Sequence, residues 1–212
     1  MAIPGAANAI FFNHGQCCCA GSRLFVHRDQ FDEVVEGVAD QARQIKLGPG
    51  MDPQCGMGPM VSDIQQQRVC SYLESGLSDG AEAVVGGKRA DREGYFVEPT
   101  VLVNTTSDMK VIQEEIFGPV VAAVPFDDPE QLVAEANDSI YGLAAAVWTR
   151  DISKGHRVAK RLRAGNVWVN CYNIFDAALP FGGNKQSGWG REMGHEAIDM
   201  YTETKAVTIK LA

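Results

Sequence analysis

Short apolar runs alternate with amphipathic segments along most of this chain, and this alternation restricts the folds open to it. Apolar residues such as Phe31, Val35 and Val38 recur at helical spacing until Gly48-Pro49-Gly50 ends the pattern. Ser62 to Gln65 has the form of a capping box, and Asp128 with Pro129 is typical of a helix start. Helices are therefore predicted over four segments: 31–45, 62–80, 129–137 and 153–163.

Apolar runs typical of strands separate these helices. They cover 24–26, 83–85, 96–103, 120–126, 143–149 and 167–170, and the run at 143–149 is predicted to be a buried strand. Strands that alternate with helices indicate an α/β fold with a largely parallel twisted sheet flanked by helices. The segment from Thr202 to Lys210 alternates like one more strand beyond this core. We interpret it as a C-terminal β-strand oligomerisation arm that pairs with another chain.

Composition narrows the classes of function. The net charge of −8 disfavours binding to nucleic acid or to an anionic membrane surface. The longest apolar runs are far shorter than the ~20 residues that cross a bilayer. Of the six cysteines, three are consecutive and none forms a C-x-x-C pair, which argues against a zinc site. We therefore expect a cytoplasmic protein with reduced thiols.

The segment from Phe11 to Arg23 carries the three consecutive cysteines, Cys17, Cys18 and Cys19. Gly15 permits a sharp turn before them, and an apolar strand follows. A thiol at the junction of two elements can meet backbone N–H donors, which a nucleophile and a developing oxyanion both need. This loop is therefore the strongest candidate for a reactive site.

Three motifs along the chain together resemble the NAD(P)-dependent aldehyde dehydrogenase superfamily. The first is the pattern F-x-x-G-Q-x-C, formed here by Phe12, Gly15, Gln16 and Cys18. The second is the run from Glu114 to Pro119, and the third extends from Pro180 to Glu192. The resemblance implies a catalytic domain at 1–186, a connecting segment at 187–201, and an oligomerisation strand and tail at 202–212. This sequence departs from the family at Asn184, where relatives commonly carry Tyr.

The resemblance assigns Cys18 as the catalytic nucleophile. In the family, this thiolate attacks an aldehyde to form a thiohemiacetal, hydride passes to NAD or NADP, and water releases the acid from a thioester. The alternative of a buried structural cysteine fits Cys55, Cys70 and Cys171 better.

The resemblance also implies cofactor-binding residues. Glu115 matches the glutamate that accepts hydrogen bonds from the nicotinamide ribose, and Phe117 would brace the nicotinamide. Gln65 and Arg68 occupy positions that contact the adenosine part in relatives, although any polar helix face predicts the same residues.

The aldehyde is expected to bind among aromatic side chains. Phe175 and Phe181 resemble the residues that line the family's substrate tunnel, with Phe12 facing them and with Cys17 and Cys19 beside or beneath the pocket. Uncharged aromatic walls favour a hydrophobic or aromatic aldehyde, although core packing would explain any one of these rings. We expect Asn170 to fix its loop by hydrogen bonding rather than to react.

Complete family members are more than twice as long and carry the cofactor-binding domain upstream. The oxyanion asparagine, the phosphate-binding lysine and the water-activating glutamate belong to that part, so no residue here takes those roles. We therefore expect an aldehyde dehydrogenase fragment that is inactive alone. The alternative is a non-enzymatic assembly module that pairs with a second copy or with a full-length relative.

Overall fold

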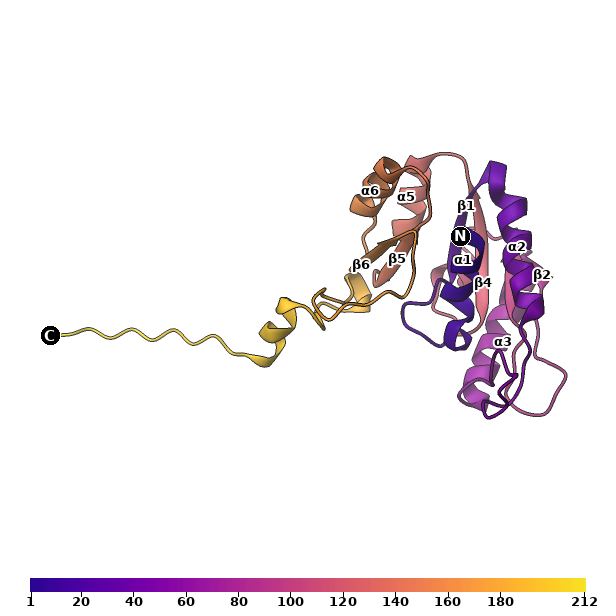
Figure 1. The fold of residues 1–212 in the computed structure, drawn as a ribbon, viewed down its shortest axis with the longest axis horizontal. Coiled ribbons are helices and arrows are strands. Elements are labelled where there is room, and N and C mark those ends of the chain that lie inside the picture. Colours follow the sequence, from indigo (N-terminus) through magenta and orange to yellow (C-terminus); the bar gives the residue numbers. More distant parts are fainter.

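A four-stranded sheet forms the centre of the computed structural model, which describes residues 1–212 (Figure 1). Its strands lie in the order β1-β4-β3-β2. They span Arg23–His27 (β1), Glu82–Val85 (β2), Thr100–Val103 (β3) and Val120–Phe126 (β4). β1 and β3 both pair in parallel with β4, whereas β2 runs antiparallel to β3. The predicted α/β fold with a largely parallel sheet is confirmed.

Helices cover both faces of this sheet. Val121 and Ala123 of β4 pack in one core cluster with α1 (Ala2–Phe11) and α2 (Phe31–Gln44). Val120 and Ala122, the alternate residues of the same strand, pack in a second cluster with α3 (Asp63–Ser78). Side chains of a strand point to opposite faces in turn, so a strand buried on both faces needs an unbroken apolar run. β4 has that run from Val120 to Ala123.

The predicted helix starts are present. The Ser62 side chain accepts from the backbone N–H of Gln65, and Asp128 caps α5 (Pro129–Asn137) in the same way through Glu130. Only half of the predicted capping box forms at Ser62, because the Gln65 side chain donates elsewhere. The four-residue helix α4 (Lys110–Gln113) was not predicted.

A smaller unit follows α5. β5 (Ala144–Val147) and β6 (Asn166–Val169) pair in parallel, and α6 (Ile152–Arg161) packs against both strands. The prediction that 143–149 forms a buried strand is wrong in its burial, since every residue of β5 is half-buried. In a sheet of only two strands, helices do not bury both faces of β5 as they bury both faces of β4.

The predicted strand at 96–103 is also shorter than expected. Regular pairing begins at Thr100, and Val97 makes only an isolated bridge to Arg89. Pro99 interrupts the run, because it has no N–H to donate to a neighbouring strand.

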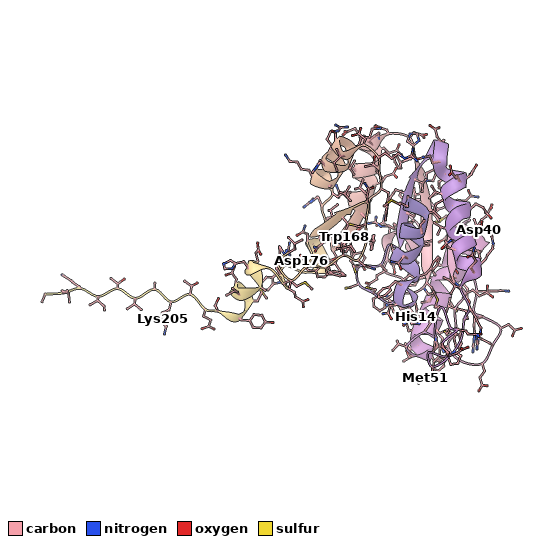
Figure 2. The ribbon with its side chains drawn as sticks, in the orientation of Figure 1. His14, Asp40, Met51, Trp168, Asp176 and Lys205 are labelled. Carbon is pink, nitrogen blue, oxygen red and sulfur yellow. The ribbon has the colours of Figure 1, made fainter.

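The last part of the chain leaves the compact body (Figure 1). Its glycine-rich loop is closed by an antiparallel bridge between Phe181 and Glu192. A 3₁₀ turn at Lys185–Ser187 lies inside this loop, and another at His195–Tyr201 follows it. Residues 202–212 are exposed throughout and form no strand within the chain. Figure 2 labels Lys205 on this extended tail. The expected pairing of the tail with another chain stays a prediction.

No helix of the molecule has both the length and the apolarity to cross a membrane.

Candidate active site

The cysteine loop connects the end of α1 to the start of β1. A 3₁₀ turn at Phe12–Gly15 follows α1. Its last three residues have positive φ: 48° at Asn13, 62° at His14 and 65° at Gly15. The Asn13 side chain closes the turn by donating to the carbonyl of Gln16 at 2.8 Å. Left-handed conformations in consecutive residues reverse the chain sharply, which places the three cysteines beyond the helix end.

Only the middle cysteine of the triplet is exposed. Cys18 faces solvent, Cys19 is 4% exposed, and Cys17 is half-buried. The three cysteines lie in a tight turn closed by the Ala20 N–H, which donates to the Cys17 carbonyl at 3.0 Å, and the sulfur atoms of Cys17 and Cys19 lie 3.4 Å apart. Of the three thiols, Cys18 is the one that a substrate can reach.

Burial raises the pKa of the Cys18 thiol above its usual range, and the neighbouring Cys17 adds to the effect. The backbone N–H groups of Cys18 and Cys19 act in the opposite direction. Burial also raises the pKa of Cys19, to about 12. Within these 212 residues, the Cys18 thiol is therefore protonated at neutral pH, and the loop alone does not supply an activated thiolate.

Two side chains of the loop, His14 and Gln16, bond to the backbone of the segment at 58–61. Nε2 of His14 accepts the backbone N–H of Gly58 at 3.0 Å, and Oε1 of Gln16 accepts that of Val61 at 3.0 Å. The bond to His14 requires a neutral imidazole with its proton on Nδ1, and Nδ1 is buried without a partner. Both residues thus hold the turn that precedes Cys18.

The second sequence motif packs directly against the first. A Cβ on Gly15 would overlap the carbonyl group of Gly118, and one on Gly118 would press into Val69 of α3. Phe117, just before this contact, has a φ of +59°. The contact brings the segment 114–118 beside the cysteine loop, although about a hundred residues of chain separate them.

The predicted cofactor residues meet along this segment. Gln65 donates from Nε2 to the carbonyl of Phe117 at 2.9 Å, and Arg68 donates from Nη2 to the carbonyl of Glu115 at 2.8 Å. Both side chains thus fix the backbone of the motif, rather than simply facing solvent as a polar helix face would. The Glu115 carboxylate is exposed and makes no hydrogen bond or ion pair.

The loop after β6 contacts the cysteine loop from the other side. Oη of Tyr172 donates to the carbonyl of Cys19 at 2.7 Å, and the Cys19 thiol lies 3.4 Å from Oδ1 of Asn173. Sequence reasoning missed Tyr172 and Asn173. Nothing in the linear pattern links residues that lie about 150 positions apart in the chain.

Aromatic rings gather next to this contact. Trp168, labelled in Figure 2, lies with its ring centroid 4.8 Å from that of Tyr172 and 5.6 Å from that of Phe175. Phe175 and Phe181 are 5.3 Å apart and edge to face. Phe12 is 56% exposed and is not one of these stacked rings, and its position opposite Phe175 and Phe181 stays a prediction.

Other predicted positions have structural roles. Asn170 bonds to both the N–H and the carbonyl of Thr149, so the expectation that it fixes its loop is confirmed. Asn184, the departure from the family pattern, accepts a hydrogen bond from Arg191 at 2.9 Å. Cys55, Cys70 and Cys171 were predicted to be buried structural cysteines, and all three are only half-buried. The Cys55 thiol, for example, donates to the carbonyl of Gly48.

Comparison with known proteins identifies the family to which this chain belongs. Residues 1–207 match the aldehyde dehydrogenase family. The chain belongs to this family. An aldehyde dehydrogenase of Agaricus bisporus is 49% identical over 211 residues, which are the whole of this chain and 42% of that protein. This member of the family thus spans about two fifths of the length of the curated relatives that it matches.

Solved structures of the family share the fold. The NAD+ complex of an aldehyde dehydrogenase from Bacillus cereus is 52% identical and superposes with a TM-score of 0.96, covering 99% of this chain and 43% of that one. A betaine aldehyde dehydrogenase from Staphylococcus aureus, also in complex with NAD+, is 43% identical with a TM-score of 0.91. That match covers 94% of this chain and 40% of the other.

Proposed function

We propose that this chain forms the catalytic part of an NAD(P)-dependent aldehyde dehydrogenase, with Cys18 as the nucleophile. The observation that carries the proposal is the exposure of Cys18 between two sulfur-bearing neighbours that are more buried. His14, Gln16 and Tyr172 hold its loop from both sides. A fixed, exposed thiol at the end of a helix turn is the arrangement that nucleophilic attack on a carbonyl needs.

In this proposal, the ionised sulfur of Cys18 attacks the aldehyde carbon to form a thiohemiacetal. The backbone N–H groups of Cys18 and Cys19, which act on the thiol, are the donors that this chain offers to the negative charge. His14 and Gln16 hold the turn that precedes those donors. The raised pKa of Cys18 means that activation of the thiol depends on groups outside these 212 residues.

The residues around Glu115 fit the nicotinamide half of NAD or NADP, and the cofactor when bound supplies the hydride acceptor. The Glu115 carboxylate is exposed and without a partner, while Arg68 and Gln65 hold the backbone on which it stands. Its two oxygens could accept both hydroxyls of a ribose. Phe117 completes the contact with its half-buried ring.

A hydrophobic or aromatic aldehyde is the substrate class that the aromatic side chains favour. The rings of Phe175 and Phe181 form an apolar wall, and Cys17 and Cys19 lie beside Cys18. The betaine aldehyde dehydrogenase among the similar structures suggests an alternative, because aromatic rings also bind quaternary ammonium groups. Comparing benzaldehyde with betaine aldehyde as substrates separates the two.

A chimera tests the proposal. Residues 1–207 of this chain would replace the matching segment of the Bacillus cereus enzyme, and NADH or NADPH formation would be measured with an aldehyde. The chimera is expected to oxidise the aldehyde, whereas the Cys18→Ser chimera is expected to lose all but a trace of turnover. Cys70→Ser, on α3, is the matched control and should leave the rate unchanged. Full activity in the Cys18→Ser chimera would overturn the proposal.

The 212-residue chain alone is expected to show no turnover, since it supplies neither an activating base for Cys18 nor a phosphate-binding segment for the cofactor. The measurement is NADH formation by the purified chain with saturating aldehyde. Turnover comparable to that of the chimera would contradict this expectation.

A second candidate function is assembly. The proposed division is a catalytic domain at 1–186, a connecting segment at 187–201 and an oligomerisation strand and tail at 202–212. It is supported by the exposed, extended tail, in which Val207, Ile209 and Leu211 alternate with polar residues. Such a segment can complete a ladder with a second copy or a full-length relative. A strictly monomeric chain in light scattering at high concentration would exclude assembly with itself.

A cytoplasmic location is also proposed. All six cysteines are free, including the close pair Cys17 and Cys19, and free thiols at such distances persist in reducing compartments. Imaging of the tagged protein in its own cells tests this, and accumulation in an organelle would contradict it.

A further inference from the structure

Tyr172 makes a contact with the cysteine loop that the mechanism above has not used. Its hydroxyl donates to the carbonyl of Cys19 at 2.7 Å, although 153 residues separate the two in sequence. The ring is held by Trp168, whose own indole N–H donates to the carbonyl of Ile174 at 2.8 Å. Burial raises the pKa of Tyr172, so its hydroxyl keeps the proton that it donates. The Tyr172 hydroxyl is therefore fixed in position, and it stays protonated and able to donate.

The carbonyl that Tyr172 holds belongs to the residue immediately after Cys18. The N–H of this same residue, Cys19, is one of the two backbone donors that favour the ionised form of the Cys18 thiol. Upstream of the thiol, Gln16 and His14 already fix the loop to the segment at 58–61. Downstream, Cys19 is held through its carbonyl by Tyr172 and through its thiol by the neighbouring Asn173.

We propose that Tyr172 is a positioning residue for the Cys18 nucleophile. By holding the Cys19 carbonyl, its hydroxyl fixes the orientation of residue 19 and keeps that residue's N–H directed at the Cys18 sulfur. The inference rests on the proposed function, in which Cys18 is the nucleophile. Tyr172 acts through the backbone and does not touch the substrate.

Substitution of Tyr172 by Phe separates the hydroxyl from the ring. The Phe ring can still pack on Trp168, whereas the bond to the Cys19 carbonyl is lost. The measurement is the rate at which iodoacetamide alkylates Cys18 in the purified chain, resolved by peptide mass spectrometry and followed from neutral to alkaline pH. The titratable neighbours that act on the Cys18 thiol are Cys17 and Cys19, and their alkylation is followed in the same digest.

At neutral pH, Cys18 in Y172F is expected to react about three- to tenfold more slowly than in the wild-type chain, the effect of losing one hydrogen bond. The two rates should converge at a pH where the thiol is fully ionised. A merely structural role predicts another result, because a loosened loop would expose Cys18 and increase its rate at every pH. That increase, or identical profiles for the two chains, would overturn the proposal.

Tyr72→Phe is the matched control. It also removes a hydroxyl hydrogen bond, here to Glu114 at 2.8 Å, but on α3 and away from the Cys19 carbonyl. Its Cys18 profile should equal that of the wild-type chain. Alkylation of Cys70 on α3 reports whether Y172F is folded. A rate increase shared by Cys18 and Cys70 would show that the substitution unfolds the chain, and it would contradict a role confined to the loop.

This test is independent of catalysis. Alkylation requires neither aldehyde nor cofactor, so the proposal for Tyr172 can fail while Cys18 remains the nucleophile. Conversely, retained activity in the Cys18→Ser chimera would reject the proposed function without changing the alkylation profiles.

Discussion

Gly15 lies so close to Gly118 that a Cβ on Gly15 would overlap the Gly118 carbonyl oxygen. Gly15 also has a φ of +65°, a conformation that residues with a Cβ rarely adopt. This one contact joins the loop that carries Cys18 to the segment that carries Glu115. The spacing between the proposed nucleophile and the proposed ribose-binding carboxylate therefore depends on the absence of a side chain at position 15.

Gly15→Ala is expected to destabilise the chain by at least about 2 kcal/mol, because the new methyl group meets backbone atoms at an unfavourable φ. The measurement is the free energy of unfolding in urea. Gly50→Ala is the control, since a Cβ there has open space around it. Equal unfolding midpoints for the two variants would show that the Gly15–Gly118 contact is not as close as described.

Gln65→Leu removes the amide that donates to the Phe117 carbonyl. The loss of a hydrogen bond to a half-buried loop is expected to cost about 0.5–1.5 kcal/mol in the free energy of unfolding. In the chimera, it should also raise the KM for the cofactor, because the backbone beside Glu115 keeps only the bond from Arg68. Gln67→Leu, which removes only an exposed bond to Asp63, is the control. A larger loss from the control than from Gln65→Leu would contradict this role.

Cys18 and Cys19 should differ in the pH at which they are alkylated. Alkylation requires the thiolate, and burial raises the pKa of Cys18 above its usual range and that of Cys19 to about 12. Each thiol is neutral below its pKa, so both rates should increase with rising pH, with Cys19 reacting after Cys18. The urea-unfolded chain provides the reference rates. Cys18 that reacts as fast when folded as when unfolded at neutral pH would contradict the raised pKa.

Removal of residues 202–212 should abolish self-association without lowering the melting temperature. Every residue of this tail is exposed, so the rest of the chain loses no buried contact with it. Light scattering and thermal unfolding together provide the measurement. A chain that keeps the tail but carries Val207→Ser and Ile209→Ser should also be monomeric, because the apolar face of the strand is lost. Association that survives both changes would place the interface elsewhere.

The local elements could be predicted from the sequence because their determinants are local. Ser62 and Asp128 cap α3 and α5 as their side-chain chemistry dictates, and the apolar run at 120–126 is the central strand over its whole predicted length. Each wrong prediction about a strand has a physical cause. Pro99 delays the start of β3, and the narrow two-stranded sheet leaves β5 only half-buried.

The motifs likewise identified the segments of the candidate site but not their contacts. Gln65 and Arg68 were predicted as residues near a cofactor, whereas the structure shows them bonded to the backbone of the segment that carries Glu115. Phe12 belongs to the first motif and is 56% exposed, whereas the rings of Phe175 and Phe181 stack on each other.

The sequence by itself determined the fold class, the positions of α2, α3, α5 and α6 and of most strands, the three motifs and the acidic charge, since each of these depends on residues close together in the chain. Only the tertiary structure decided that Cys18 is the exposed thiol of the triplet, that Gly15 meets Gly118, and that Tyr172 holds Cys19. Such contacts join residues about one hundred to one hundred and fifty positions apart. They arise when the packing of both sheet faces brings distant loops together, and no local pattern records that packing.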